Sequence, residues 1–415
     1  MKFLKNNLII NNKNVYNYFI TLFVRSFVIF SGFVVFLVTS YIFGPEGRGV
    51  IGLGTSVASF FGLVFSFNLG RSFLNLTQKS PTSRKLFLFD FLTLNYLLMF
   101  IAILMLFLYY FSNIQLKLIF DFDLLLPFCA LIPFYLWSVN GSDIFAALNK
   151  TKLQDIAILI TRLILILMAL FVYIFNFLEL RTFLYLYAFI LGFGTIIEMR
   201  LLGKPSIYIS FKKTYQYFSN SIIPHIDYLS FVLFPLILMV MSAHYLNLTE
   251  LGNLNFTYQL IYFIFTFSFV ASLKIKTYVS QKGMLAYSIS IKKLLFYTII
   301  FSFILVFIIY IIVSTSFFNK HFPGFENISD YFLILSLSIP GYMFYHFLYP
   351  ILIEYRLIHY SMKFNLIVLF LSCFISFWLL NNYGILGACF SFSLFFCLIF
   401  ISYLYLYKKL KLLFV

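Results

Sequence analysis

The sequence predicts an all-α membrane protein that crosses the bilayer about twelve times, and three observations support this prediction. Of the 415 residues, 63% are hydrophobic and 10% are charged, whereas a soluble domain carries about 25% charged residues. Apolar runs long enough to cross a hydrocarbon layer of about 30 Å recur about twelve times along the chain. Lys and Arg fall almost entirely in every second gap between these runs, which indicates alternating sides of a membrane.

The apolar runs set the expected spans. In chain order they are residues 18–42, 50–74, 87–111, 124–147, 156–176, 182–199, 218–243, 254–274, 293–314, 331–353, 364–380 and 384–406. Each span is expected to be a helix, because a helix satisfies its own backbone hydrogen bonds inside hydrocarbon. The runs are continuously apolar and lack the alternation of membrane β-strands.

Local features agree with this series of helices. The first span carries Arg25 and has no small-residue cleavage site, so it is expected to be retained rather than removed as a signal peptide. Gly residues recur in the first two spans, and Pro340 and Gly341 interrupt the tenth. Such positions allow either close helix packing or a hinge.

The distribution of Lys and Arg predicts the orientation. Of 29 such residues, 22 lie in alternate gaps on one side, and Arg25, Arg71 and Arg162 lie within spans. Four lie in gaps on the other side: Arg48, Lys117, Arg181 and Lys320. Because cytoplasmic loops collect Lys and Arg, both chain ends are expected in the cytoplasm. The same rule accounts for the net charge of +16 without a nucleic-acid partner.

The connection between the sixth and seventh spans divides the chain. It covers about residues 200–217 and is basic, so it is expected in the cytoplasm. Six spans with the same orientation lie on either side of it, which is the arrangement of a parallel repeat. Two six-helix lobes are therefore predicted, residues 1–212 and 213–415.

Ionisable side chains within the spans are the candidate functional residues. All are expected in the cytoplasmic half of the membrane, and they are Arg25, Arg71, Asp90, Asp143, Arg162, His225 and Asp227. Ionisable groups at such depth are costly and mark functional sites, although long side chains also reach the interface. Structural ion pairs are the alternative for residues at similar depth on consecutive spans, namely Arg71 with Asp90 and Asp143 with Arg162.

Arg25 has no such partner nearby in the sequence and is the strongest candidate for contact with an anion. A guanidinium binds phosphate oxygens in bidentate fashion and stays charged when it is desolvated. The four cysteines lie inside apolar runs without metal-ligand spacing. No cofactor motif is present, so neither a metal nor a cofactor is expected.

Two glycine-containing hairpins carry a resemblance to a known family. The first reads Gly44-Pro45-Glu46-Gly47-Arg48-Gly49, and the span after it ends in Asn68-Leu69-Gly70-Arg71. The last reads Tyr383-Gly384-Ile385-Leu386-Gly387-Ala388. Together with the span count, the topology and the division into two halves, these segments resemble the Wzx-type polysaccharide flippases, a branch of the MATE-like superfamily.

The resemblance implies a MATE-like fold and a transporter rather than an enzyme. The expected substrate is an undecaprenyl-diphosphate-linked oligosaccharide repeat unit of an O-antigen, capsule or exopolysaccharide. It would be moved to the outer leaflet of the bacterial cytoplasmic membrane by alternating access. The expected partners are this substrate and membrane lipids, with polysaccharide polymerase machinery as a further candidate.

The resemblance, together with the charge and depth of the side chains, suggests roles for the candidate residues. Arg25 and Arg71 match the family's cationic cavity, and Arg162 and His225 would extend an electropositive vestibule for the pyrophosphate and glycan. The seventh span departs from the family, because it carries His225 where a Lys or Arg is often found. The acidic residues are candidates for coupling to a proton or cation, namely Asp90, Asp143 and Asp227.

Other functions predict different sequences. A MATE-like multidrug exporter would share the fold but place acidic groups in its cavity. A lipid II flippase of the same superfamily typically has more than twelve spans. A membrane polysaccharide polymerase would carry a long outside loop with Arg and His, whereas the longest here, about 315–330, holds only Lys320 and His321. The five histidines form no motif for an acyltransferase.

Overall fold

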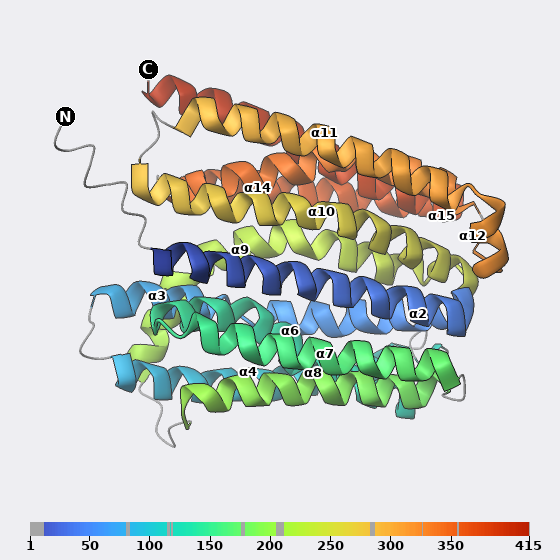
Figure 1. Ribbon diagram of the computed structural model, residues 1–415, viewed down its shortest axis with the longest axis horizontal. Coiled ribbons are helices and arrows are strands. Elements are labelled where there is room, and N and C mark those ends of the chain that lie inside the picture. The colour runs from blue at the N-terminus through green and yellow to red at the C-terminus, as the bar shows by residue number, and fades with distance from the viewer. Residues whose placement is uncertain are drawn as a thin grey trace.

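The computed structural model describes residues 12–79, 84–113, 117, 119–175, 179–204, 211–282, 287–325, 327–354 and 357–414 (Figure 1). Over these residues the chain forms helices joined by short connections, without a strand. The helices are α2 (Asn12–Val64), α3 (Leu69–Lys79), α4 (Arg84–Ser112), α6 (Phe122–Ala147), α7 (Thr151–Phe175), α8 (Leu180–Leu202), α9 (Phe211–Ser242), α10 (Leu248–Lys282), α11 (Tyr287–Val313), α12 (Ser316–His321), α13 (Ile328–Ser336), α14 (Ile339–Glu354) and α15 (Ile358–Phe414). The predicted all-α fold is confirmed.

Many of these helices are long and apolar enough to cross a membrane. Among the described residues there are eight such helices, or up to nine if α13 and α14, which meet at an angle of 40°, form one span. Two of the eight, Ser26–Thr77 and Ile358–Lys408, exceed 50 residues, far more than the roughly 20 that a single crossing needs. The protein is therefore a multi-pass membrane protein.

Both long stretches contain a glycine at which two helices meet. Gly44 has φ 60° and ψ −168°, and Gly384 has φ 54° and ψ −127°, values that an L side chain rarely adopts. Across the first glycine, the Arg48 guanidinium donates a hydrogen bond of 3.1 Å to the Thr39 hydroxyl. These residues flank Gly44 at similar distances, so the two helices of α2 run antiparallel (Figure 1).

A short break separates α2 from α3. Two of its residues, Phe67 and Asn68, have positive φ angles of 46° and 48°. The side chain of Asn140 on α6 bridges the break, because it accepts a hydrogen bond from the Gly70 N–H and donates one to the Ser66 carbonyl, each at 3.0 Å. Backbone groups at this break are thus satisfied by a side chain of the neighbouring helix α6 rather than by hydrogen bonds within the helix itself, as expected in a membrane.

The buried apolar residues gather in separate cores. One core lies within α9–α15 and includes Phe36 of α2. The other two lie within α2–α8, and Tyr217 of α9 contributes to one of them. The division into two six-helix lobes at about residue 212 stays a prediction.

Most predicted spans agree with one described helix to within a few residues at their ends, whereas the break at residues 65–68 divides the predicted span 50–74 between α2 and α3. The break in the tenth span lies near where the sequence placed it, because α13 ends at Ser336 and α14 begins at Ile339, next to Pro340 and Gly341. A Cβ on Gly341 would lie 1.9 Å from the Phe396 carbonyl oxygen, which fits the close-packing explanation. The total of twelve crossings and the cytoplasmic position of both ends stay predictions.

Candidate functional site

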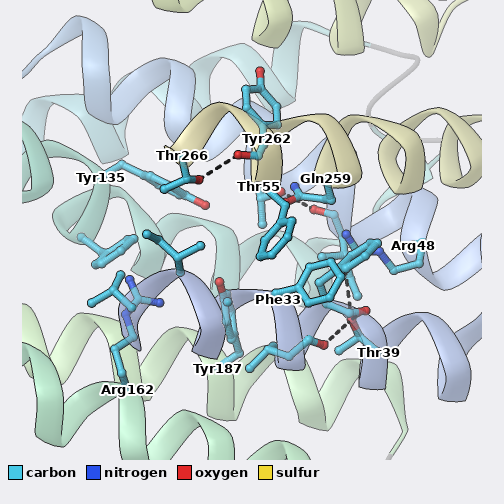
Figure 2. Close-up of a pocket in the computed structure, with 18 of the residues that line it drawn as sticks. Phe33, Thr39, Arg48, Thr55, Tyr135, Arg162, Tyr187, Gln259, Tyr262 and Thr266 are labelled. Atoms are coloured by element: carbon cyan, nitrogen blue, oxygen red, sulfur yellow. Dashed lines mark hydrogen bonds between the residues drawn. The ribbon is translucent and has the colours of Figure 1, made fainter. Parts of the chain in front are cut away.

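A cavity of about 360 Å³ lies between the two halves of the chain (Figure 2). Its walls come from both helices of α2 and from α6, α7 and α8 of the first half, and from α10 of the second half. The polar groups lining it are Thr39, Arg48, Thr55, Tyr135, Arg162, Tyr187, Gln259, Tyr262 and Thr266. Among the described residues, no acidic side chain lines this cavity.

Arg48 is held inside the protein by neutral partners. It is 5% exposed, and its guanidinium donates to the Thr39 hydroxyl and to the Asn255 side-chain oxygen on α10. It also lies over the Phe36 ring, 4.8 Å from the ring centroid. Its Nε is buried without a hydrogen-bond partner in the described part of the chain.

Arg162 lines the same cavity from α7 and stacks on Phe134, 5.5 Å from the ring centroid. In Figure 2, Arg162 and Arg48 lie at opposite ends of the cavity with Tyr187 between them. The phenol of Tyr187 interacts electrostatically with both guanidinium groups. The cavity therefore presents two cations in series along one wall.

Arg162 also borders a second cavity, of about 200 Å³, between α6, α7 and α8. Glu198 lines this cavity and accepts hydrogen bonds from Trp137 Nε1 at 3.0 Å and from Gln154 Nε2 at 3.4 Å. Glu198 interacts electrostatically with Arg162. The acidic residue that interacts with Arg162, Glu198, is therefore on α8 and does not line the central cavity.

Neither of the ion pairs considered from the sequence is present among the described residues. Within the described part of the chain, no ion pair joins Arg71 to Asp90 or Asp143 to Arg162; the ion pair present joins Arg181 and Asp123. Similar depth on consecutive spans is not enough to form an ion pair, because the two side chains must also lie on the helix faces that pack against each other. Arg162 turns toward the central cavity instead.

The other candidates lie in several places. The side chain of Arg25, on α2, lies outside the described residues. Asp90 is buried on α4. Arg71 on α3 and Asp143 on α6 are half-buried, and both interact electrostatically with the phenol of Tyr349 on α14.

His225 joins α9 to the break that ends α2. Its Nε2 lies 3.0 Å from the Val64 carbonyl oxygen, and its ring lies 5.3 Å from that of Phe67. A carbonyl accepts only, so Nε2 carries the proton. His225 is therefore a contact between the two halves of the chain and does not line the central cavity.

Asp227 lies two residues further along α9, in a closed polar cluster. Its Oδ1 accepts hydrogen bonds from the Ser361 hydroxyl at 2.6 Å and from the Asn365 amide at 2.9 Å. The Asn365 amide also donates to the Tyr403 hydroxyl at 3.2 Å, across the two helices of α15. Asp227 is fully buried, and its Oδ2 and the Asn365 Oδ1 have no hydrogen-bond partner among the described residues.

No family model and no curated protein sequence matches the chain, but solved structures do. A structure of the lipid II flippase MurJ in an inward closed conformation gives a TM-score of 0.72 at 16% identity and covers 95% of this chain and 87% of that one. A multidrug resistance MATE transporter of the MOP superfamily, inward-facing, gives 0.63 at 10% identity, with 94% and 98% covered. A MOP superfamily transporter from Pyrococcus furiosus gives 0.54 at 10% identity, with 95% and 94% covered.

The fold is similar to that of these solved transporters, two of which are members of the MOP superfamily. The predicted MATE-like architecture is thereby confirmed over nearly the whole chain. At these identities the likeness establishes the MOP fold alone, so the narrower resemblance to Wzx-type flippases stays a prediction.

Within this fold, Arg48 is the functional candidate that the sequence reasoning missed. The sequence places it in the outside gap between the predicted spans 18–42 and 50–74. The second helix of α2 begins directly after Gly44, so Arg48 lies in its first turn and faces the central cavity. The glycines at positions 47, 49 and 52 are the sequence signal that Arg48 lies on a helix, because small residues mark a close helix contact rather than a loop.

Proposed function

We propose that the protein is a flippase that moves an undecaprenyl-diphosphate-linked oligosaccharide repeat unit of a surface polysaccharide from the inner to the outer leaflet of the bacterial cytoplasmic membrane. The glycan and diphosphate pass through the central cavity, while the lipid tail stays in the bilayer. Alternating access of the two lobes carries the headgroup across.

The sign of the charge in the central cavity is the observation that carries this proposal. Arg48 and Arg162 line it, and among the described residues no acidic side chain does. Arginine in a low-dielectric cavity favours an anion with several oxygens, because the guanidinium fork matches phosphate geometry. A cationic drug would meet the positive charge of Arg48, which has no ion pair within the described part of the chain, so this lining disfavours a multidrug exporter.

The remaining polar lining suits a glycan. Thr39, Thr55, Gln259 and Thr266 offer hydroxyl and amide groups beside the aromatic walls. Sugars present hydroxyl groups at their edges and apolar C–H faces, so such a lining accommodates them without a further charge. MurJ, one of the similar solved structures, is a lipid II flippase, so its named substrate is likewise a lipid.

The predicted residues take separate roles in this cycle. Arg162 holds the diphosphate within the cavity, and Arg25 and Arg71 receive it at the cytoplasmic end. His225 closes the contact between the halves at the break after α2. Asp227 carries the coupling ion or proton, because a buried carboxylate without a cationic partner among the described residues has to be neutralised during the cycle. Asp90 and Asp143 are secondary candidates for coupling.

The sidedness of the lipid-linked glycan tests the proposal. Cells that lack the protein are expected to accumulate complete repeat units on undecaprenyl diphosphate in the inner leaflet, with no surface polymer. Wild type and an Arg181→Ala variant are expected to restore export, because Arg181 lies at the surface in an ion pair. Arg162→Ala is expected to fail at normal protein level.

One outcome would replace this function. Complete units that reach the outer leaflet in the absence of the protein, but remain unpolymerised, would place the step after flipping and favour a polysaccharide polymerase. Normal sidedness together with loss of resistance to cationic drugs would favour a multidrug exporter.

A further inference from the structure

The two halves of the chain meet in a tight seam at the Gly44 end of the central cavity. We define the seam by Pro45 and Gly49 on α2 and by Leu248 and Gly252 on α10. A Cβ on Gly252 would lie 1.8 Å from the Pro45 carbonyl oxygen, and a Cβ on Gly49 would lie 2.2 Å from the Leu248 carbonyl oxygen. Only glycine allows the helices to approach so closely, so the seam closes this end of the cavity.

Arg48 is the side chain that reaches across the seam. It starts on α2 beside Gly49 and donates a hydrogen bond to the Asn255 side-chain oxygen on α10. A second hydrogen bond, to Thr39, ties it to the first helix of α2. Because Arg48 also lines the central cavity, a ligand in the cavity and the seam have access to the same guanidinium.

The partners of Arg48 leave its charge uncompensated. They are an amide oxygen, a hydroxyl and the face of Phe36, and no ion pair to it exists within the described part of the chain. Its Nε is buried with no partner there. A diphosphate offers the guanidinium an opposite charge and a bidentate match to its fork, which the neutral oxygens of Asn255 and Thr39 do not, so an oxyanion in the cavity competes well for this side chain.

Arg162 and Arg48 are successive contacts along the cavity. Both line the cavity, Arg162 from α7 and Arg48 from the second helix of α2. Figure 2 shows the two guanidinium groups at opposite ends of the cavity, with Tyr187 between them.

We infer that Arg48 is an anion-operated latch: a diphosphate that advances from Arg162 takes the Arg48 guanidinium from Asn255 and thereby releases the seam between α2 and α10. This rests on the proposed function for the identity of the anion. The latch explains how a headgroup that advances from Arg162 opens only the seam ahead of it. The seam stays closed while the cavity is empty, because Arg48 then has its neutral partners.

Distance measurements across the seam test the latch in the full-length protein. Spin labels are placed at Glu46 and His244, which are exposed on the two sides of the seam, after the four cysteines are replaced by alanine. The probe is inorganic pyrophosphate, with binding measured in parallel by calorimetry. Pyrophosphate is expected to increase the ratio of the long-distance to the short-distance population by about tenfold. The reason is that the anion binds preferentially to the state in which the seam is released.

Variants separate the latch from simple binding. Asn255→Ala is expected to raise the long-distance population without pyrophosphate, since it removes the partner of Arg48 across the seam. Arg48→Gln is expected to abolish the pyrophosphate response, whereas Arg48→Lys retains part of it. His359→Ala is a control, because His359 is exposed away from the seam.

The possible results have distinct meanings. Pyrophosphate that binds to wild type while the distances stay unchanged would overturn the latch and leave the proposed flippase intact. Absence of binding of both pyrophosphate and undecaprenyl diphosphate to wild type would overturn the anion site and the latch together. A response that persists in Arg48→Gln would also overturn the latch.

Discussion

His225 Nε2 lies 3.0 Å from the carbonyl oxygen of Val64, the residue at which α2 ends. In a continuous helix this carbonyl would accept from the N–H four residues later, but Asn68 there has a positive φ. The break thus frees an acceptor in one half of the chain, and the other half supplies the donor. This contact lies beside α3, away from the Arg48 seam.

The contact predicts a specific loss of stability for His225→Ala. The Val64 carbonyl would be left unsatisfied, which costs about 1–3 kcal/mol, whereas His225→Gln retains a donor. Thermal unfolding of the purified variants is the measurement, with exposed His359→Ala as the control. Equal midpoints for the two alanine variants would show that the contact contributes nothing.

Arg162 is expected to be required for export in a charge-dependent manner. Arg162→Ala should reduce export at least tenfold, because roughly 1.5–3 kcal/mol is typical for a hydrogen bond to a charged group. Arg162→Lys should retain part of the activity, since it keeps the charge and loses the fork. Surface polymer and lipid-linked intermediate are measured together at matched protein level.

The same residue distinguishes two interpretations of the sequence. Reversing the charges of both Asp143 and Arg162 is expected not to restore export, because no ion pair joins them. Restoration by the double reversal, after failure of each single reversal, would contradict the placement of Arg162 toward the central cavity.

Asp227→Asn is expected to uncouple transport from its driving force. The amide keeps the size of the side chain and an oxygen for the Ser361 and Asn365 donors, but it cannot release a proton or compensate a cation. Transport down a substrate gradient should persist in proteoliposomes, while accumulation driven by an ion gradient should be lost. Retention of gradient-driven accumulation would remove Asp227 from the coupling role.

The sequence determines the membrane architecture well and the site poorly, for a physical reason. Hydrocarbon thickness and backbone satisfaction fix the lengths of helices, so the spans and the glycine turns at Gly44 and Gly384 follow from local pattern. Which helix face meets the cavity depends on packing between distant segments. Arg162 is a candidate from the sequence because it is charged at depth, whereas Arg48 is not, because its partner Asn255 lies 207 residues away.

The position of His225 illustrates the same limit. Its depth within a span marked it correctly as unusual, but sequence alone assigned it to an anion site. Its actual contact is a backbone carbonyl that is exposed by a break in another helix. No side-chain pattern in the sequence around Val64 indicates that its carbonyl is available as an acceptor.

The seam gives a final prediction, which concerns Gly252. In Gly252→Ala, the new Cβ would lie 1.8 Å from the Pro45 carbonyl oxygen, and backbone cannot yield as a flexible side chain does. The helices must therefore separate, and the labels at Glu46 and His244 should report long distances in the absence of any anion. Gly32→Ala is the matched control, because a Cβ at Gly32 meets nothing within 4 Å and alanine favours the helix by about 1 kcal/mol. Short distances in Gly252→Ala would mean that α2 and α10 tolerate the methyl group, and the close approach of these helices would then not hold the seam shut.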